Sequence, residues 1–168
     1  MLLGLSTILR TPDAVLPFEA SLDLSDLKFG SSYPVSEPVQ AVGSVRNTAG
    51  VLILRANIRT VLHGSCDRCA VDFSREVSYD VEAVLTRELE NEDEADEWTF
   101  LLENDHADLD DILTTAFVLN MDSKLLCKPD CKGLCFRCGK NLNDGACDCR
   151  PESDPRWAVL GQLLKDKE

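Results

Sequence analysis

Eight cysteines constrain this chain more than any other feature, because six of them fall within the 23 residues from Cys127 to Cys149. Two of these, Cys135 and Cys138, are separated by two residues and followed by Gly139, a pattern typical of a zinc knuckle. Thiolates on one tight turn can bind the same ion, and glycine lets the backbone amides turn toward the sulfurs. The turn-forming run 141–145 is expected to bring the thiols of Cys147 and Cys149 back to that ion.

The other cysteines of the cluster, Cys127 and Cys131, need partners elsewhere. The remaining candidates are Cys66 and Cys69, which are again separated by two residues. We therefore predict two structural Zn²⁺ sites of four cysteines each. The long-range site contains Cys66, Cys69, Cys127 and Cys131, and the local site contains Cys135, Cys138, Cys147 and Cys149. The same spacings allow other partitions, such as one ion shared by the two Cys-x2-Cys knuckles.

Two other readings of the cysteines are a disulfide framework and a redox dithiol. Disulfides are typical of small secreted chains, but the apolar run 1–9 has neither a basic region nor a small-residue cleavage site. We read that run as the start of the fold and expect a cytoplasmic protein with reduced thiols. Redox Cys-x-x-Cys motifs begin a helix in a βαβ pattern, whereas Cys66 and Cys69 lie between two strand-like runs. Both readings are therefore weaker than metal binding.

Four stretches alternate between apolar and polar residues with a period of two, which predicts half-buried strands. They span residues 14–24, 39–45, 51–62 and 71–85, and the last two flank the segment with Cys66 and Cys69. The short apolar run 98–102 predicts a further strand. From Asp108 onward, apolar residues recur at helical spacing to Met121, with acids in the first turn. A second helix is predicted from Asp154, with an apolar stripe and a basic end.

This order predicts an α+β fold with an antiparallel, partly barrel-like sheet, packed helices and a Cys-rich zinc-binding C-terminal segment. We expect residues 1–123 to form the sheet body, with an acidic excursion at 88–97. Residues 124–168 would form the zinc-binding segment and the C-terminal helix, as part of the same domain. No apolar run approaches the ~20 residues that span a bilayer, so we expect no membrane association.

The net charge of −13 is unevenly distributed along the chain. Residues 88–123 contain 13 acids and no base, whereas residues 124–168 contain nine bases and seven acids. A basic patch on the metal-bound segment could contact RNA phosphates, and two strand arginines on the polar face could extend it. The candidate nucleic-acid-binding residues are Arg55, Arg59, Lys128, Lys132, Arg137 and Lys140. The acidic segment is a candidate surface for a basic protein.

An ordered set of motifs resembles the YceD family, the large ribosomal RNA subunit accumulation proteins. The set begins with Cys66-Asp-Arg-Cys69 and continues with Asp108-Leu-Asp110. It then contains Cys131-Lys-Gly-Leu-Cys135-Phe-Arg-Cys138-Gly-Lys-Asn-Leu-Asn143 and Cys147-x-Cys149, and it ends with Asp154-Pro-Arg156. The resemblance implies a bacterial cytoplasmic protein connected with 23S ribosomal RNA synthesis, processing or accumulation.

The residues and the resemblance both favour a protein that is not an enzyme and has no small-molecule substrate. A closed four-thiolate site lacks the open position that metal catalysis needs. The main hypothesis is a ribosome-biogenesis factor that acts on large-subunit ribosomal RNA or its precursor particles. An acidic adaptor for a basic ribosomal protein is the second hypothesis, and a Cys-x-x-Cys thiol oxidoreductase is the third. Whether purified RNA alone binds the protein distinguishes the first hypothesis from the second. The third hypothesis is excluded if Cys66 and Cys69 are bound to metal and do not react with alkylating reagents.

Overall fold

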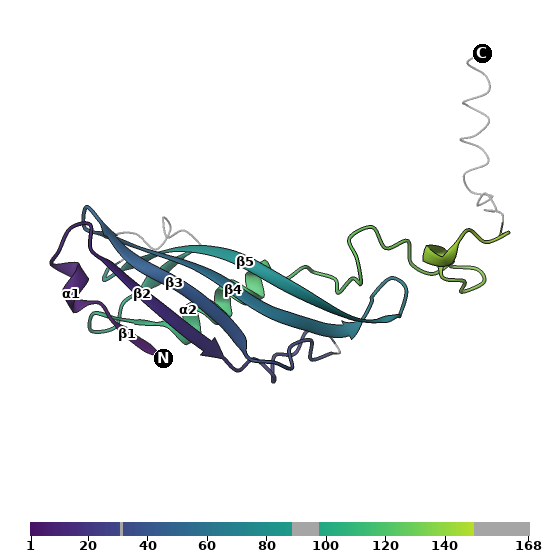
Figure 1. Ribbon diagram of the computed structural model, residues 1–168, viewed down its shortest axis with the longest axis horizontal. Helices are drawn as coiled ribbons and strands as arrows, with labels where there is room; N and C mark the ends of the chain where they lie inside the picture. The colour runs from purple at the N-terminus through teal and green to yellow at the C-terminus, as the bar shows by residue number, and fades with distance from the viewer. Residues whose placement is uncertain (31, 89–97, 150–168) are drawn as a thin grey trace, which may run out of the picture.

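The body of the molecule is a long, twisted sheet, seen in a computed structural model that describes residues 1–30, 32–88 and 98–149 (Figure 1). Within these residues the sheet has five strands in the order β2-β3-β4-β5-β6. Their bounds are β2 Val15–Leu22, β3 Val39–Thr48, β4 Val51–Ser65, β5 Asp72–Thr86 and β6 Thr99–Leu101. The strands β2 to β5 are antiparallel to their neighbours, and β6 is parallel to β5. The four predicted long strands and the short fifth one are therefore present.

The β4–β5 hairpin is the longest part of the sheet and carries the first pair of cysteines. Its register runs from Leu52 opposite Leu85 to Ser65 opposite Asp72. Every second residue of β4 from Leu52 to Leu62 is buried, as the alternation predicts. Because a shift of one residue would turn this apolar set to solvent, the core fixes the register. The register in turn fixes where the turn with Cys66 and Cys69 protrudes.

Helix α2 (Leu109–Asn120) covers one face of the sheet, as the helical spacing predicts (Figure 1). The Asp108 carboxylate caps it by accepting a hydrogen bond from the Asp110 backbone N–H, and the acids of the first turn complement the helix dipole. Its buried residues are Leu109, Ile112, Leu113, Ala116 and Phe117. The Phe117 ring meets the edge of the Tyr79 ring on β5, with centroids 5.8 Å apart. The helix therefore directs the chain from the sheet toward Cys127.

Among the described residues the sheet is open, so the structure does not support the expectation of a partly barrel-like sheet. Strands β2 and β6 stand at opposite edges of the described sheet and are not paired with each other. A physical reason is that α2 fills the face that would become the interior of a barrel, contacting both β2 and β5. The other face of the sheet is solvent-exposed, and its Val42 side chain is 59% exposed.

Three short elements complete the fold at the N-terminal end and before α2. Strand β1 (Leu2–Gly4) pairs with β7 (His106–Asp108) in a separate two-stranded sheet, and α1 (Ser6–Leu9) follows β1. The run 1–9 is thus part of the fold, with Leu5 and Ile8 in the core. No helix in the described ranges is long and apolar enough to cross a membrane. The predicted C-terminal helix, and all but the first residue of the acidic excursion at 88–97, lie outside the described residues.

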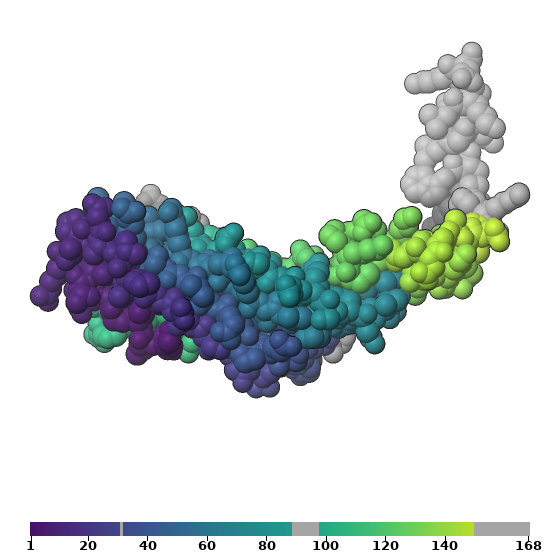
Figure 2. All heavy atoms as spheres, in the orientation of Figure 1, coloured from purple at the N-terminus to yellow at the C-terminus, as the bar shows by residue number. Residues whose placement is uncertain are grey.

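Beyond α2, the described tail extends from one end of the body (Figure 2). This tail begins where the chain leaves α2 and includes the short 3-10 helix η2 (Leu142–Asp144). It meets the body at the tip of the β4–β5 hairpin, where Asp67 and Leu125 are hydrogen-bonded to each other. All eight cysteines lie at this end of the molecule.

Candidate metal centre

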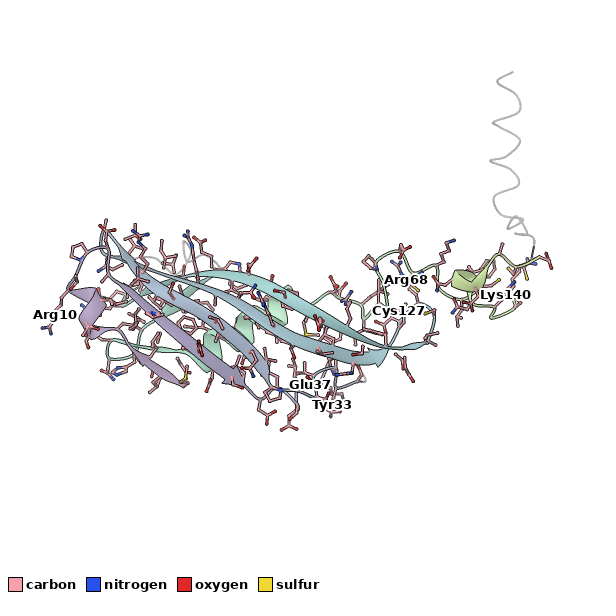
Figure 3. The ribbon with its side chains drawn as sticks, viewed as in Figure 1. Arg10, Tyr33, Glu37, Arg68, Cys127 and Lys140 are labelled. Carbon is pink, nitrogen blue, oxygen red and sulfur yellow. The ribbon has the colours of Figure 1, made fainter. Side chains whose placement is uncertain are left out.

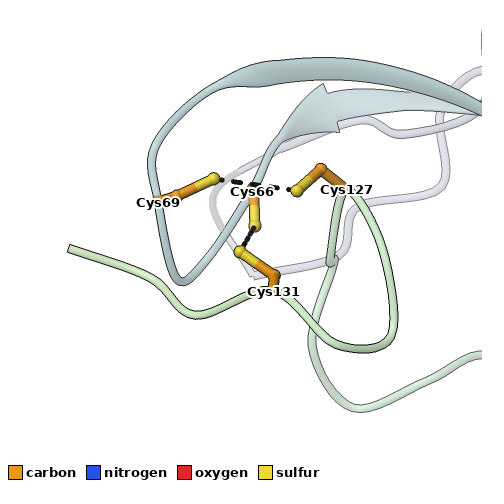
Figure 4. Close-up of side chains that lie close together, drawn as sticks. All are labelled: Cys66, Cys69, Cys127 and Cys131. Atoms are coloured by element: carbon orange, nitrogen blue, oxygen red, sulfur yellow. Dashed lines mark hydrogen bonds between the residues drawn. The ribbon is translucent and has the colours of Figure 1, made fainter. Parts of the chain in front are cut away.

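The four cysteines of the long-range site converge where the hairpin tip meets the tail (Figure 4). Their Sγ atoms all lie within 4.8 Å of one another. The Sγ atoms of Cys66 and Cys131 are 3.7 Å apart, and those of Cys69 and Cys127 are also 3.7 Å apart. Three of the four residues are buried, and Cys127 is half-buried. The structure therefore brings together thiols that are 58 to 65 residues apart in sequence.

A tight turn at the hairpin tip aims Cys66 and Cys69 at this point. The backbone N–H of Ala70 donates to the Cys66 carbonyl at 2.8 Å, and Ala70 has a left-handed φ of 56°. The tail is held against this turn by two reciprocal hydrogen bonds. The Asp67 N–H donates to the Leu125 carbonyl at 2.8 Å, and the Leu125 N–H donates to the Asp67 carboxylate at 2.7 Å. Because Leu125 is buried in the core, Cys127 is placed within two residues of a fixed point.

The four cysteines of the local site lie farther out on the tail, again with all Sγ atoms within 4.8 Å of one another. The knuckle turn is closed by the Gly139 N–H, which donates to the Cys135 carbonyl at 2.9 Å. Gly139 has φ of 72°, a conformation that suits glycine. The segment that returns to Cys147 contains η2. This site is more exposed than the long-range site, since only Cys135 is buried.

Asn143 connects the two groups of cysteines. Its side-chain Nδ2 donates to the Cys131 Sγ at 3.3 Å, and its Oδ1 accepts the Lys132 N–H at 3.0 Å. Asn143 thus stands on the segment that closes the local site but donates to a thiol of the long-range site. A second connection joins the Leu134 N–H to the Arg68 carbonyl at 2.9 Å. Order in one group therefore supports order in the other.

Both groups could hold a metal ion, and two distances in the long-range group fit a tetrahedral one. A metal–sulfur bond of about 2.3 Å places tetrahedral sulfurs about 3.8 Å apart, close to the 3.7 Å observed for two pairs of the long-range site. A disulfide would need about 2.05 Å, and all eight cysteines are free thiols in the described structure. Four thiolates are also the donor set that structural Zn²⁺ prefers, and they leave no open coordination position.

The pKa values of the thiols show how the knuckles prepare them as ligands. At Cys66, burial opposes ionisation, but backbone hydrogen bonds from Cys127, Arg68 and Cys69 lower the thiol pKa to about 6. At Cys135, backbone hydrogen bonds from Cys138 and Arg137 lower the pKa to about 6. Burial, followed by hydrogen bonds to the other thiols, raises the pKa of Cys127 to about 12. Each group therefore contains one readily formed thiolate, and in the long-range group a metal would have to displace the proton of Cys127.

The candidate nucleic-acid-binding residues fall into two separate sets. Arg55 and Arg59 lie on the exposed face of β4, where Arg55 forms an ion pair with Glu82 at 3.0 Å. Arg59 Nε donates to the Asn57 side chain. Arg59 precedes the end of β4 by six residues, or about 20 Å of strand. The described part of the tail, up to residue 149, extends past the hairpin tip and away from the strand that carries these arginines (Figure 1).

The tail bases form the other set, which consists of Lys128, Lys132, Arg137 and Lys140. Lys128 and Lys132 are exposed, and the Arg137 guanidinium lies 6.0 Å from the Phe136 ring centroid. Lys140 Nζ donates to the Ala146 carbonyl at 2.8 Å. Figure 3 shows Lys140 farther from the body than Cys127 and Arg68. The structure therefore gathers the tail bases near the cysteines but not with the strand arginines.

Three residues that support the candidate metal centre were missed by the sequence interpretation: Asp67, Arg68 and Asn143. Asp67 and Arg68 lie inside the motif Cys66-Asp-Arg-Cys69. Two charged residues between two candidate ligands could have indicated that they support the site. The Arg68 guanidinium donates to the Cys131 carbonyl at 3.0 Å. Asn143 could not be singled out, because asparagine in a turn-forming run is ordinary.

Comparison with known proteins gives one family. The model of the family described as "Large ribosomal RNA subunit accumulation protein YceD" matches residues 54–164. One relative is the Arabidopsis thaliana protein named "Large ribosomal RNA subunit accumulation protein YCED homolog 1, chloroplastic". It is 26% identical to this chain, and the match covers 89% of this chain and 56% of the relative. Its Zea mays counterpart is 26% identical over 76% of this chain and 54% of its own length.

A shorter match covers part of the chain. An uncharacterized protein of Mycobacterium tuberculosis is 37% identical over 57 residues, which are 34% of this chain and 28% of that protein. The chain spans about half the length of the plant relatives it matches. No solved structure matches it significantly.

Proposed function

The chain belongs to the YceD family, and from this premise we propose that it is a non-catalytic factor in the accumulation of large-subunit ribosomal RNA. The observation that carries the proposal is the family match over residues 54–164, which includes both groups of cysteines. The names of the plant relatives support the same role. The proposed setting is the cytoplasm, and the proposed partners are large-subunit ribosomal RNA or its precursor particles.

The proposed role of the cysteines is structural. Cys66, Cys69, Cys127 and Cys131 would hold one Zn²⁺, and the local group would hold a second. Zn²⁺ bound in this way supplies a cross-link between thiolates whose formation is coupled to folding. The long-range group would fasten the tail to the hairpin, and the local group would shape the tail itself. Four sulfur ligands would fill every coordination position of each ion, so neither ion would activate water or a substrate.

The described bases of the tail are the proposed RNA contacts. Lysines and arginines neutralise phosphates and supply most of the sequence-independent affinity of RNA-binding proteins. The exposed Lys128 and Lys132 stand beside the metal centre, with Arg137 and Lys140 farther along the tail. A contribution from Arg55 and Arg59 would require a second contact across the exposed face of the sheet.

A second candidate is favoured by the 13 acids between residues 88 and 123. Such a charge excess repels RNA and attracts a basic protein. In this reading the protein is an adaptor for a basic ribosomal protein, and its contact with RNA is indirect. Thiol oxidoreduction is less well supported, because the four-thiol grouping favours closed metal coordination over an accessible dithiol.

The test is a triple charge reversal, Lys128→Glu with Lys132→Glu and Lys140→Glu. We expect the variant to retain two zinc ions but to be lost from large-subunit precursors in sedimentation through a density gradient. Arg10→Glu, at the opposite end of the molecule (Figure 3), controls for a general effect of added negative charge. Unchanged co-sedimentation of the triple variant would mean that these bases are solvated surface. Binding to a basic ribosomal protein but not to purified RNA would then favour the adaptor.

A further inference from the structure

A hollow beside the long-range group of cysteines has an unusual concentration of positive charge. It has a volume of about 390 Å³ and is lined by residues of the hairpin and of the chain that follows α2. Its charged lining consists of Arg68, Arg75, Lys124 and Asp122. Arg68 lies between the two hairpin cysteines, and Lys124 lies three residues before Cys127. The contact that assembles the metal centre therefore also assembles this hollow, here called the Arg68/Arg75 hollow.

In three other arginine-containing hollows on the described part of the sheet, acidic residues balance the arginines. One hollow is lined by Arg59 and a second by Arg55 and Ala56. Each of these two hollows also has two acids in its lining. These acids are Glu37 and Glu76 in the first, and Asp80 and Glu82 in the second. A third hollow contains Arg46 and Arg55, but these are paired with Asp13 and Glu82. The Arg68/Arg75 hollow retains two unbalanced positive charges among its lining residues.

Hydrogen bonds hold the two arginines of the hollow in place, and each guanidinium has further N–H groups that these bonds do not use. Arg68 uses one N–H for the Cys131 carbonyl at 3.0 Å. Arg75 donates from a terminal nitrogen to the Asp122 carboxylate at 3.2 Å. Its Nε is buried and has no hydrogen-bond partner among the described residues. A buried guanidinium N–H without an acceptor is costly, so an acceptor such as a water molecule or a bound anion is expected beside it.

We propose that the Arg68/Arg75 hollow binds a phosphate group. Arginine forks match phosphate oxygens in two-point contacts, Lys124 adds a point charge, and the adjacent Ser123 adds a hydroxyl donor. In the setting of the proposed function, on which this part of the inference rests, the phosphate is a phosphodiester of RNA. The hollow would fix the register of the strand on the protein, while the tail lysines add less specific attraction.

The direct test observes Arg75 in the full, zinc-loaded chain. Inorganic phosphate, and separately a single-stranded RNA oligonucleotide, are titrated while the Arg75 Nε–H resonance is followed by ¹⁵N NMR. A ligand that accepts this N–H should shift the resonance in a saturable way. Lys124→Gln should weaken RNA binding roughly tenfold and reduce the salt slope by about 0.7, the value for one phosphate contact with a single strand. Lys28→Gln, an identical change at another exposed lysine, is the matched control.

Each outcome decides the inference. No shift of Arg75 with either ligand, or equal effects of Lys124→Gln and Lys28→Gln with RNA, would overturn it. A saturable shift with phosphate but not with RNA supports the phosphate site and assigns it to a small phosphate compound. Co-sedimentation with large-subunit precursors is scored separately. If the wild-type chain fails to co-sediment, the proposed function fails, while a phosphate-induced shift of Arg75 would still support the hollow as a site.

Discussion

The contact between Gly133 and Arg68 offers the sharpest test of how the tail is attached to the body. Gly133 has a left-handed φ of 74°, and a Cβ placed on it would lie 2.9 Å from the Arg68 carbonyl oxygen. That oxygen is a backbone atom and also accepts the Leu134 N–H at 2.9 Å. Gly133→Ala must therefore push the tail away from the hairpin tip, in addition to straining the backbone at residue 133.

Gly139 provides a nearly matched control. Its φ is 72°, but a Cβ there would meet nothing within 4 Å. Alanine in this conformation costs about 1–2 kcal/mol at either position. Only Gly133→Ala also disturbs the Arg68 contact, and loss of that hydrogen bond adds about 1 kcal/mol before any cost of the clash. We therefore expect Gly133→Ala to destabilise tail docking by about 2–4 kcal/mol and Gly139→Ala to leave it nearly unchanged.

Amide hydrogen exchange at Leu134 and Leu125 measures tail docking directly. About 1.4 kcal/mol corresponds to a tenfold change, so a loss of about 2–4 kcal/mol in Gly133→Ala should speed exchange at Leu134 by roughly 30-fold to 700-fold. Exchange at Leu134 in Gly139→Ala should stay within a few-fold of the wild type. Equal acceleration by the two variants would refute the reasoning, because it would mean that backbone strain alone governs the tail.

Three other predictions concern the metal sites and the core. Elemental analysis of the reduced protein should give about two zinc ions per chain, and a value near one would argue against the long-range site. Cys66→Ser should speed amide exchange at both the hairpin tip and the tail, whereas Cys147→Ser should act mainly within residues 132–149. Equal disruption would mean that the cysteines are partitioned differently. Phe117→Ala should lower the free energy of unfolding in urea by about 3–5 kcal/mol. Arg55→Ala, at an exposed ion pair, should lower it by less than about 1 kcal/mol, and a larger loss would show a structural role.

The sequence predicted the parts of the fold that depend on local periodicity. Strands β2 to β5 and helix α2 each bury one face, so their apolar spacing is visible along the chain. Short elements such as β1 and β7, with three residues each, contain too few residues to show a period. Whether the sheet closes depends on which edge strands meet, and this is decided by the packing of α2. That packing is a tertiary property that no single strand encodes.

For the candidate site, spacing predicted which thiols come together but not what supports them. Two Cys-x2-Cys turns and the cysteines that follow them limited the possible partitions to a few. The supporting contacts of Asp67 with Leu125, and of Asn143 with Cys131, join segments far apart in sequence. The expected extension of the basic patch to Arg55 and Arg59 depended on the direction in which the tail leaves the hairpin. The structure directs the tail outward and places Arg68, Arg75 and Lys124 near the metal centre instead.

The long-range group also sets an order of events during synthesis. Its first two thiols leave the site of translation with the hairpin, and its last two follow 58 to 65 residues later. Strands β6 and β7 and helix α2 lie between them, so the group is complete only after α2 has been synthesised. Binding of an ion by all four thiols would therefore come after synthesis of the strands and helix of the body. A nascent chain that stalls just before Cys131 would leave Cys66, Cys69 and Cys127 without the fourth thiol of the group and open to oxidation.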